Sequence, residues 1–250
     1  MLFLRSAQRH VFRCSSLAIL SVSIFSLFSS AQSKSPTNAN SKVPASNLEA
    51  VLTQMDTAAA QFRSAEADFT QDLYQKVVNE TDTQKGKVYF RRTGKGDMQM
   101  AANTQSPDEK FVTFTDGKIR IYQPKINQIN EYDAGKNRDE FQSFLVLGFG
   151  GSGHDLEKQF EVKLAGSEDV DGVSTAKLEL TPKSAKVKSN FEKFIIWVDT
   201  SRDVSLKQQA FEPSGDYRLS HYSNIKLNGK IPDDVFKLHT SGRTKTVKGT

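Results

Sequence analysis

The spacing of hydrophobic positions along the chain changes once, just after Phe62. Before this point apolar residues recur three and four positions apart, which places them on one face of an α-helix. Ser46-Asn47-Leu48-Glu49 has the form of a capping box, so the helix is predicted to begin at Ser46. The residues of the apolar face are Leu48, Val51, Leu52, Met55, Ala59 and Phe62.

From Ala65 onward apolar and polar residues alternate, the pattern of half-buried β-strands. Asp116-Gly117 separates two of these runs and is typical of a tight hairpin. Roughly ten short runs joined by turns predict an antiparallel meander, either a barrel or a strongly curved sheet. The apolar runs fall within 65–73, 88–92, 98–100, 111–114, 119–121, 160–164, 176–180, 191–198, 204–211 and 217–225.

One segment interrupts the alternation. Asn137-Arg138-Asp139-Glu140 resembles a helix cap, residues 148–153 are rich in glycine, and 155–159 can form a second short helix. We predict a helix, a flexible joint and a short helix, which together form a lid. The expected fold class is therefore α+β, mainly β: an incomplete antiparallel β-barrel covered by the N-terminal helix and the mid-chain lid helices.

The N-terminus predicts export. Three arginines with no acid among them precede an apolar stretch at 17–28, and Ser29-Ser30-Ala31 has the form of a cleavage site. Residues 1–31 are therefore interpreted as a signal peptide. A retained membrane anchor is the alternative, but spanning a bilayer takes about 20 apolar residues. Cleavage would lower the formal charge from +5 to +2, so the charge is weak support for nucleic-acid binding.

The remaining domain organisation follows from composition. Residues 32–46 are rich in Ser, Asn, Lys and Pro and predict a flexible linker. The folded domain is predicted to span 47–240, and 241–250 to form a basic, frayed tail. The one cysteine, Cys14, lies in the segment that would be removed, so the mature domain would depend on its core without disulfides.

The chain contains residue types that enzymes use, but not in the arrangements that cofactor binding, metal binding or nucleophilic catalysis requires. Residues 148–153 match GxGxxG, but no βαβ pattern surrounds them. His154, His221 and His239 lack metal-ligand spacing. Ser152 is not in a Gly-x-Ser-x-Gly elbow, because His154 takes the last position. We predict a protein that is not an enzyme and has no cofactor and no metal.

Arg92 has the same strand parity as Val88 and Phe90, which places a guanidinium on an apolar face. Such a group is costly unless it is hydrogen-bonded. It is either a strand-end arginine whose head reaches water or a latch inside a cavity, and spacing does not separate the two. Trp197, among isoleucines, is more simply a core residue than a ligand contact.

A curved sheet covered by helices predicts an apolar cavity with a movable cover. Its expected lining residues are Phe62, Phe69, Val88, Phe90, Met98 and Met100. The expected lid residues are Phe141, Phe144, Leu145 and Phe149.

Four segments resemble, in order, motifs of the LolA family of periplasmic lipoprotein carriers. They are Gly86–Arg92, Asp116–Pro124, Leu180–Lys183 and Asn224–Phe236, and the similarity runs from about Leu48 to Leu238. The resemblance implies a lidded, incomplete β-barrel with an apolar interior. It also implies transfer from an inner-membrane ABC lipoprotein exporter to an outer-membrane acceptor. The family's internal arginine, which holds the lid shut, corresponds to Arg92.

Two features depart from the family pattern. Thr93 stands where a proline usually follows the arginine, and the 148–153 joint is more elaborate than the typical lid. Acylated lipoproteins are the expected cargo of a monomeric periplasmic carrier with no nucleic-acid partner. A LolA-like carrier or sensor of another envelope lipid is the alternative.

Overall fold

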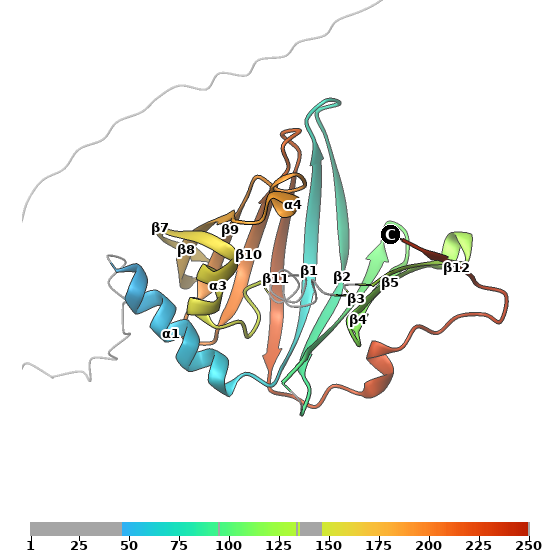
Figure 1. Cartoon of the computed structure of the whole chain (residues 1–250), viewed down its shortest axis with the longest axis horizontal. Helices are drawn as coiled ribbons and strands as arrows, with labels where there is room; N and C mark the ends of the chain where they lie inside the picture. The colour runs from blue at the N-terminus through green and yellow to red at the C-terminus, as the bar shows by residue number, and fades with distance from the viewer. Residues whose placement is uncertain (1–46, 95, 134, 136–146, 250) are drawn as a thin grey trace, which may run out of the picture. The chain divides into compact units, whose positions relative to one another are not determined.

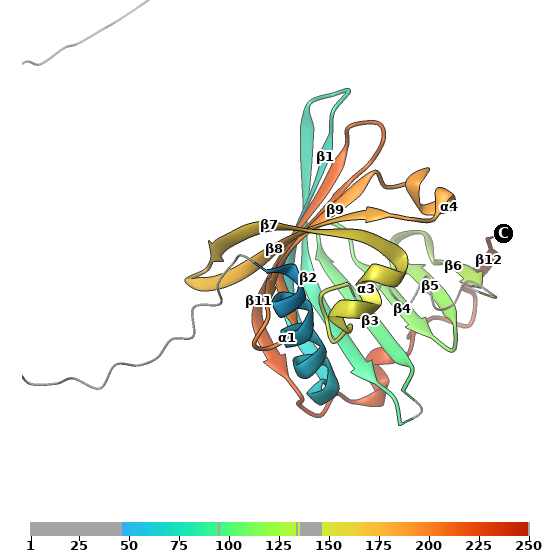
Figure 2. The same ribbon diagram turned by 60° about the vertical axis from the view of Figure 1, so that its left-hand side comes forward.

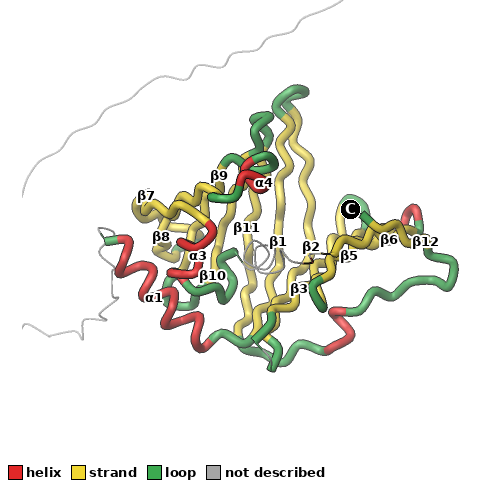
Figure 3. The backbone as a smooth tube through the Cα atoms, in the orientation of Figure 1, coloured by secondary structure: helices red, strands yellow, loops and turns green. Residues whose placement is uncertain are grey.

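The computed structural model describes residues 47–94, 96–133, 135 and 147–249. These residues form one twelve-stranded sheet with short helices (Figure 1, and by type of element in Figure 3). The helical elements are α1 (Leu48–Gln61), α3 (Gly153–Gln159), α4 (Ala185–Lys188), η1 (Pro124–Ile126) and η3 (Asp233–Phe236). The strands are β1 (Ser64–Gln75), β2 (Glu80–Arg92), β3 (Met98–Ser106), β4 (Lys110–Thr115), β5 (Lys118–Gln123), β6 (Gln128–Asp133), β7 (Phe160–Val170), β8 (Val173–Pro182), β9 (Lys193–Asp199), β10 (Val204–Phe211), β11 (Tyr217–Leu227) and β12 (Lys245–Lys248).

The sheet is open and almost entirely antiparallel. Its strand order is β12-β6-β5-β4-β3-β2-β1-β11-β10-β9-β8-β7, and the edge strands β12 and β7 do not pair with each other. Only β12 and β6 run parallel. Because β1 pairs with both β2 and β11, the first and second halves of the chain meet in the middle of the sheet. This topology confirms the predicted mainly β, incomplete antiparallel barrel.

The N-cap of helix α1 lies one residue later than predicted. Its N-cap is Asn47, whose side chain accepts a hydrogen bond from the Glu49 amide at 3.0 Å. The prediction that Ser46 caps the helix is therefore wrong, and Ser46 itself lies outside the described residues. Asparagine is as good an N-cap as serine, so the local signal could not separate the two. The predicted apolar face is confirmed, since Val51, Leu52, Met55 and Ala59 are buried.

Helices α1 and α3 cover one face of the sheet, here called the inner face (Figure 2). Val51 and Met55 of α1 and Leu156 of α3 belong to the same buried cluster as inward side chains of β8 and β9. Those strand residues are Leu178, Leu180, Phe194, Ile196 and Val198. Burying these apolar surfaces against one another is the main stabilising term of this part of the fold.

Two strands were not predicted. β6 is polar along most of its length, and β12 lies in the segment expected to be a frayed tail. That expectation is wrong for Lys245–Lys248, which pair in parallel with residues 128–131 of β6. All four residues of β12 are exposed. Backbone pairing rather than apolar burial therefore holds this edge, and such pairing leaves no hydrophobic period in the sequence.

Candidate functional site

The six predicted cavity residues meet in one apolar cluster on the inner face. Phe62, Val88, Phe90, Met98 and Met100 are buried in it, and Phe69 is partly buried against it. Strand register explains the grouping, because Phe90 lies opposite Met100 and Met100 lies opposite Phe114. Cross-strand neighbours of this kind share one face of the sheet. The sequence prediction of acyl-chain contact by these residues remains a prediction.

Phe149 fills the middle of this cluster and is 0% exposed. Its ring stacks on Phe90 with centroids 4.4 Å apart and meets Tyr222 edge-on at 4.9 Å. It belongs to residues 147–150, here called the plug segment. The apolar interior is thus occupied by one side chain from a segment that is not a strand of the sheet.

The plug segment is held along β10 by backbone hydrogen bonds. The Ser205 amide donates to the Gly148 carbonyl at 2.6 Å, and the Gly150 amide donates to the Asp203 carbonyl at 3.3 Å. The Gln208 side-chain amide also donates to the Leu147 carbonyl. Residues 147–150 are therefore fixed on both sides of Phe149.

The glycines of this segment are needed for close packing. Gly148 and Gly150 both have φ of +73°, a conformation that side chains with a Cβ disfavour. A Cβ at Gly150 would lie 2.2 Å from the Phe62 ring, and one at Gly148 would lie 2.0 Å from Ser205 Oγ. In place of the expected flexible joint, the structure has a tightly packed segment. The described residues around it contain no βαβ unit, which excludes the dinucleotide interpretation of GxGxxG.

Arg92 contacts the plug segment directly. Its Nη2 donates to the Gly150 carbonyl at 2.7 Å, and its side chain is half-buried. The same guanidinium acts electrostatically on Asp203, which is 0% exposed and has no hydrogen bond to either carboxylate oxygen. Burial raises the pKa of Asp203 to about 8, although the Arg92 charge opposes this. Of the two interpretations of Arg92, this geometry favours an internal contact over a head in water.

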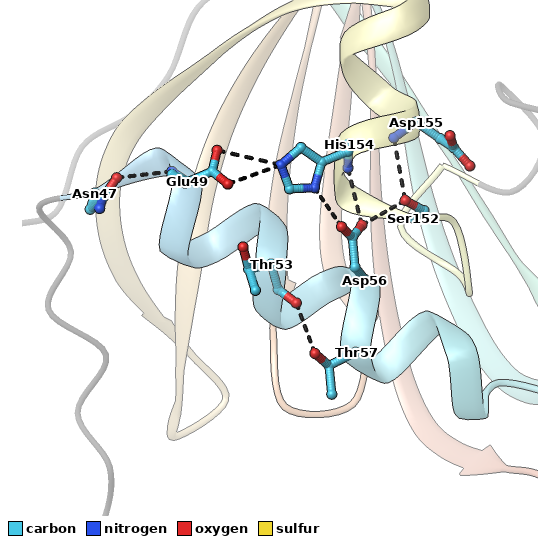
Figure 4. Close-up of polar contacts among 8 residues, drawn as sticks. All are labelled: Asn47, Glu49, Thr53, Asp56, Thr57, Ser152, His154 and Asp155. Atoms are coloured by element: carbon cyan, nitrogen blue, oxygen red, sulfur yellow. Dashed lines mark hydrogen bonds and ion pairs between the residues drawn. The ribbon is translucent and has the colours of Figure 1, made fainter.

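A second polar cluster joins α3 to α1 (Figure 4). His154 lies between two carboxylates of α1: its Nδ1 bonds to Asp56 and its Nε2 lies 3.2 Å from Glu49 Oε1. Ser152 Oγ donates to Asp56 at 2.6 Å. Since the serine bonds to the acid and not to the imidazole, the cluster is not an activated nucleophile. It is a clamp between the two helices that cover the inner face.

The clamp predicts a pH dependence of stability. Hydrogen bonding to Asp56 raises the pKa of His154 above 6.5. Burial raises the pKa of Asp56, but the hydrogen bonds from Ser152 and His154 outweigh it and lower the pKa below 3.8. The His154 contribution is therefore complete below pH 6.5 and lost as pH rises through the raised value. The Asp56 contribution is complete above pH 3.8 and lost as pH falls.

We expect His154→Gln to lower the Tm most between these two limits and least in alkali. Thermal unfolding of both proteins from about pH 4 to pH 9 measures this. His239→Gln is the control, because His239 bonds to Asp234 at an exposed turn. Parallel Tm curves for the wild-type protein and His154→Gln at every pH would contradict the assignment.

An open cleft of about 660 Å³ adjoins the plug segment between α1, α3 and the β2–β3 turn. Its walls are part apolar, with Ala59, Leu156 and Met98, and part polar, with Arg92 and Asp56. The open cleft beside the apolar cluster therefore adjoins the hydrogen bond between Arg92 and Gly150.

Of the other candidate residues, some lie among the residues that the structure describes and some do not. Phe141, Phe144 and Leu145 lie outside the described residues, so their predicted lid role stays a prediction. Trp197 is 3% exposed and belongs to the core, as expected. Within the described part of the chain, no group of three or more potential ligand side chains could hold a metal ion. None of the helices described is both long enough and apolar enough to cross a bilayer.

These features define a mainly β protein whose open sheet carries a closed apolar site on one face. Residues 60–239 match the family described as outer membrane lipoprotein carrier protein LolA. The chain belongs to this family, which confirms the resemblance seen in its motifs. LolA family carriers are periplasmic and non-enzymatic. A comparison with curated proteins finds no match.

Solved structures resemble this chain at low identity, and one of them, with a TM-score above 0.5, shares its fold. An uncharacterized conserved protein from Thermus thermophilus is 10% identical with a TM-score of 0.51, over 80% of this chain and 98% of that one. MucB of the Pseudomonas aeruginosa MucA/MucB complex is 14% identical with a TM-score of 0.47, over 77% and 61%. A LolA superfamily protein from Nitrosomonas europaea is 15% identical with a TM-score of 0.39, over 76% and 97%. The chain thus spans about three-fifths of MucB.

Proposed function

We propose that this protein is a periplasmic carrier that shields the acyl chains of lipoproteins in its interior. It would take them from an inner-membrane ABC exporter to an outer-membrane acceptor, acting as a monomer. The observation that carries the proposal is Phe149, an aromatic side chain that occupies the apolar interior from a segment outside the strands of the sheet. Such a segment can leave without unfolding the sheet, and the space it vacates suits an acyl chain.

The energetics of carriage support this function. Each methylene exposed to water costs about 0.8 kcal/mol, so a free acyl chain needs an apolar container. The interior around Phe90 would supply one, and the flexible side chains of Met98 and Met100 adapt to irregular chains. When an acyl chain displaces the Phe149 ring, the contacts that this ring makes in the closed form are lost. Their loss offsets part of the binding free energy and keeps binding weak enough for release.

Export would follow from the N-terminal segment. Residues 1–31 would act as a cleaved signal peptide and 32–46 as a linker to the carrier domain at 47–240. The family's periplasmic location supports this proposal.

Arg92 would be the latch of the closed state. Its charge-assisted bond to Gly150 contributes about 1.5–3 kcal/mol to closure. We expect Arg92→Leu to bind a triacylated lipopeptide tighter and to release it to acceptor liposomes about tenfold or more slowly. Arg91→Leu is the matched control, since Arg91 lies on the outer face of the same strand, β2, and bonds to Asp233. Equal release rates for the wild-type protein and Arg92→Leu would exclude the latch.

A carrier or sensor of another envelope lipid is the second candidate. Mass spectrometry of lipids that copurify with the protein separates the two. Triacylated peptides support lipoprotein carriage, whereas free lipids support the alternative.

A further inference from the structure

The inner face changes from apolar to polar along its strands. On β1, Phe69 is followed on the same face by Gln71, which lies opposite Gln84 of β2. On β4, Lys110 lies on the same face as Val112 and Phe114, because residues two apart share a face. The apolar cluster therefore ends in a polar region on the same surface, away from the plug segment.

Lys110 is the central group of this polar region. It is half-buried, and its Nζ donates to Gln84 Oε1 at 3.2 Å. Among the residues that the structure describes, no carboxylate pairs with this amine. Burial lowers the pKa of Lys110, and the Arg218 charge lowers it further. A half-buried ammonium with only a neutral amide partner is costly, because burial removes water without supplying a counter-ion.

Arg218 of β11 adds positive charge to the same face. It lies opposite Leu73, which shares the inner face with Phe69 and Gln71. Arg218 has a counter-ion of its own, since Nη2 lies 2.9 Å from Glu212. Ser220, two residues along β11, accepts a hydrogen bond from Gln71 at 2.8 Å. The region thus holds two cations, of which Lys110 lacks an anionic partner.

We propose that Lys110 binds the anionic headgroup of an amphiphilic lipid whose chain lies in the apolar interior. The headgroup would be the carboxylate of a free fatty acid or the phosphate of a phospholipid. Either one supplies the missing counter-ion through a charge-assisted hydrogen bond, while Phe69 and Val112 contact the first methylenes. This inference rests on the proposed function, because it requires the interior to take an acyl chain, and a free anionic lipid bound there corresponds to the second candidate cargo, another envelope lipid.

The direct test compares a pyrene-labelled fatty acid with its methyl ester, using the full chain at neutral pH. The two ligands share the chain and differ in the charge. We expect the acid to bind about tenfold or more tightly than the ester. Lys110→Gln should remove this preference and leave ester binding unchanged. Lys85→Gln is the matched control, because Lys85 is exposed on the outer face of β2 next to Gln84.

The possible results separate the two proposals. Equal affinity of the wild-type protein for acid and ester would overturn the headgroup site while supporting an acyl-chain carrier. An equal loss of both ligands in Lys110→Gln would also overturn it, since that indicates a structural role. Binding of neither ligand would overturn the carrier function and this inference with it. Once the acid preference is found, competition with lysophosphatidic acid of the same chain length distinguishes the two headgroups. Tighter binding of lysophosphatidic acid than of the fatty acid assigns phosphate, and weaker binding assigns carboxylate.

Discussion

Replacing Phe149 by alanine should weaken the fold and strengthen the binding of acyl chains. Truncating a fully buried phenylalanine costs about 3–5 kcal/mol of unfolding free energy. Here the vacated space is lined by Phe90 and other side chains of the apolar cluster, and apolar cavities of this kind stay dry and accept apolar ligands. In the wild-type protein a ligand must first displace the Phe149 ring, whereas in Phe149→Ala it need not.

Urea unfolding and titration with a pyrene-labelled acyl ester measure the two effects. Phe160→Ala is the matched control, because Phe160 is also 0% exposed but packs in the cluster beneath α1 and α3. It should lose similar stability without any gain in binding. If both variants bind the ester no better than the wild-type protein, Phe149 is an ordinary core residue and the plug proposal fails.

The parts of the fold that bury a periodic apolar face could be predicted from the sequence. Helix α1, the 116–117 hairpin and the strands of the apolar cluster follow directly from spacing. β6 and β12 could not be predicted, since backbone pairing at an edge needs no particular side chains. Local pattern alone fails where a strand is held by backbone pairing and buries no periodic apolar face.

Only part of the candidate site could be predicted from the sequence, because local pattern does not show which distant segments pack together. Phe149 and the glycines beside it stood out, but their packing against Phe62 and Ser205 depends on contacts between distant segments. Lys110 has the same strand parity as Val112 and Phe114, so the sequence carries a signal that places it on the inner face. Asp203 had no such signal, because an acid in a β-turn is usually solvated.

Asp203→Asn should stabilise the protein at neutral pH. The folded-state pKa of about 8 lies above the ordinary 3.8, so the folded protein keeps a proton that the unfolded chain loses. Stability from this group is therefore present in acid and lost as pH rises from about 4 to 8. At pH 7 the cost amounts to roughly 4 kcal/mol, at about 1.4 kcal/mol for each pH unit above the ordinary value. Asparagine carries no charge and tolerates the residue's φ of 53°.

Urea unfolding across this pH range should show the gain of Asp203→Asn growing from near zero at about pH 4. Asp199→Asn, in the same turn, is the control. It should lower the free energy of unfolding, because the Asp199 carboxylate is paired with Arg202 and Ser201. A gain that does not change with pH would mean that the Asp203 carboxylate finds a partner in solution. The acid lies within the field of Arg92, which holds the plug segment. The pH series therefore measures how much the ionisation of a buried acid beside the plug segment lowers the free energy of unfolding of the closed form.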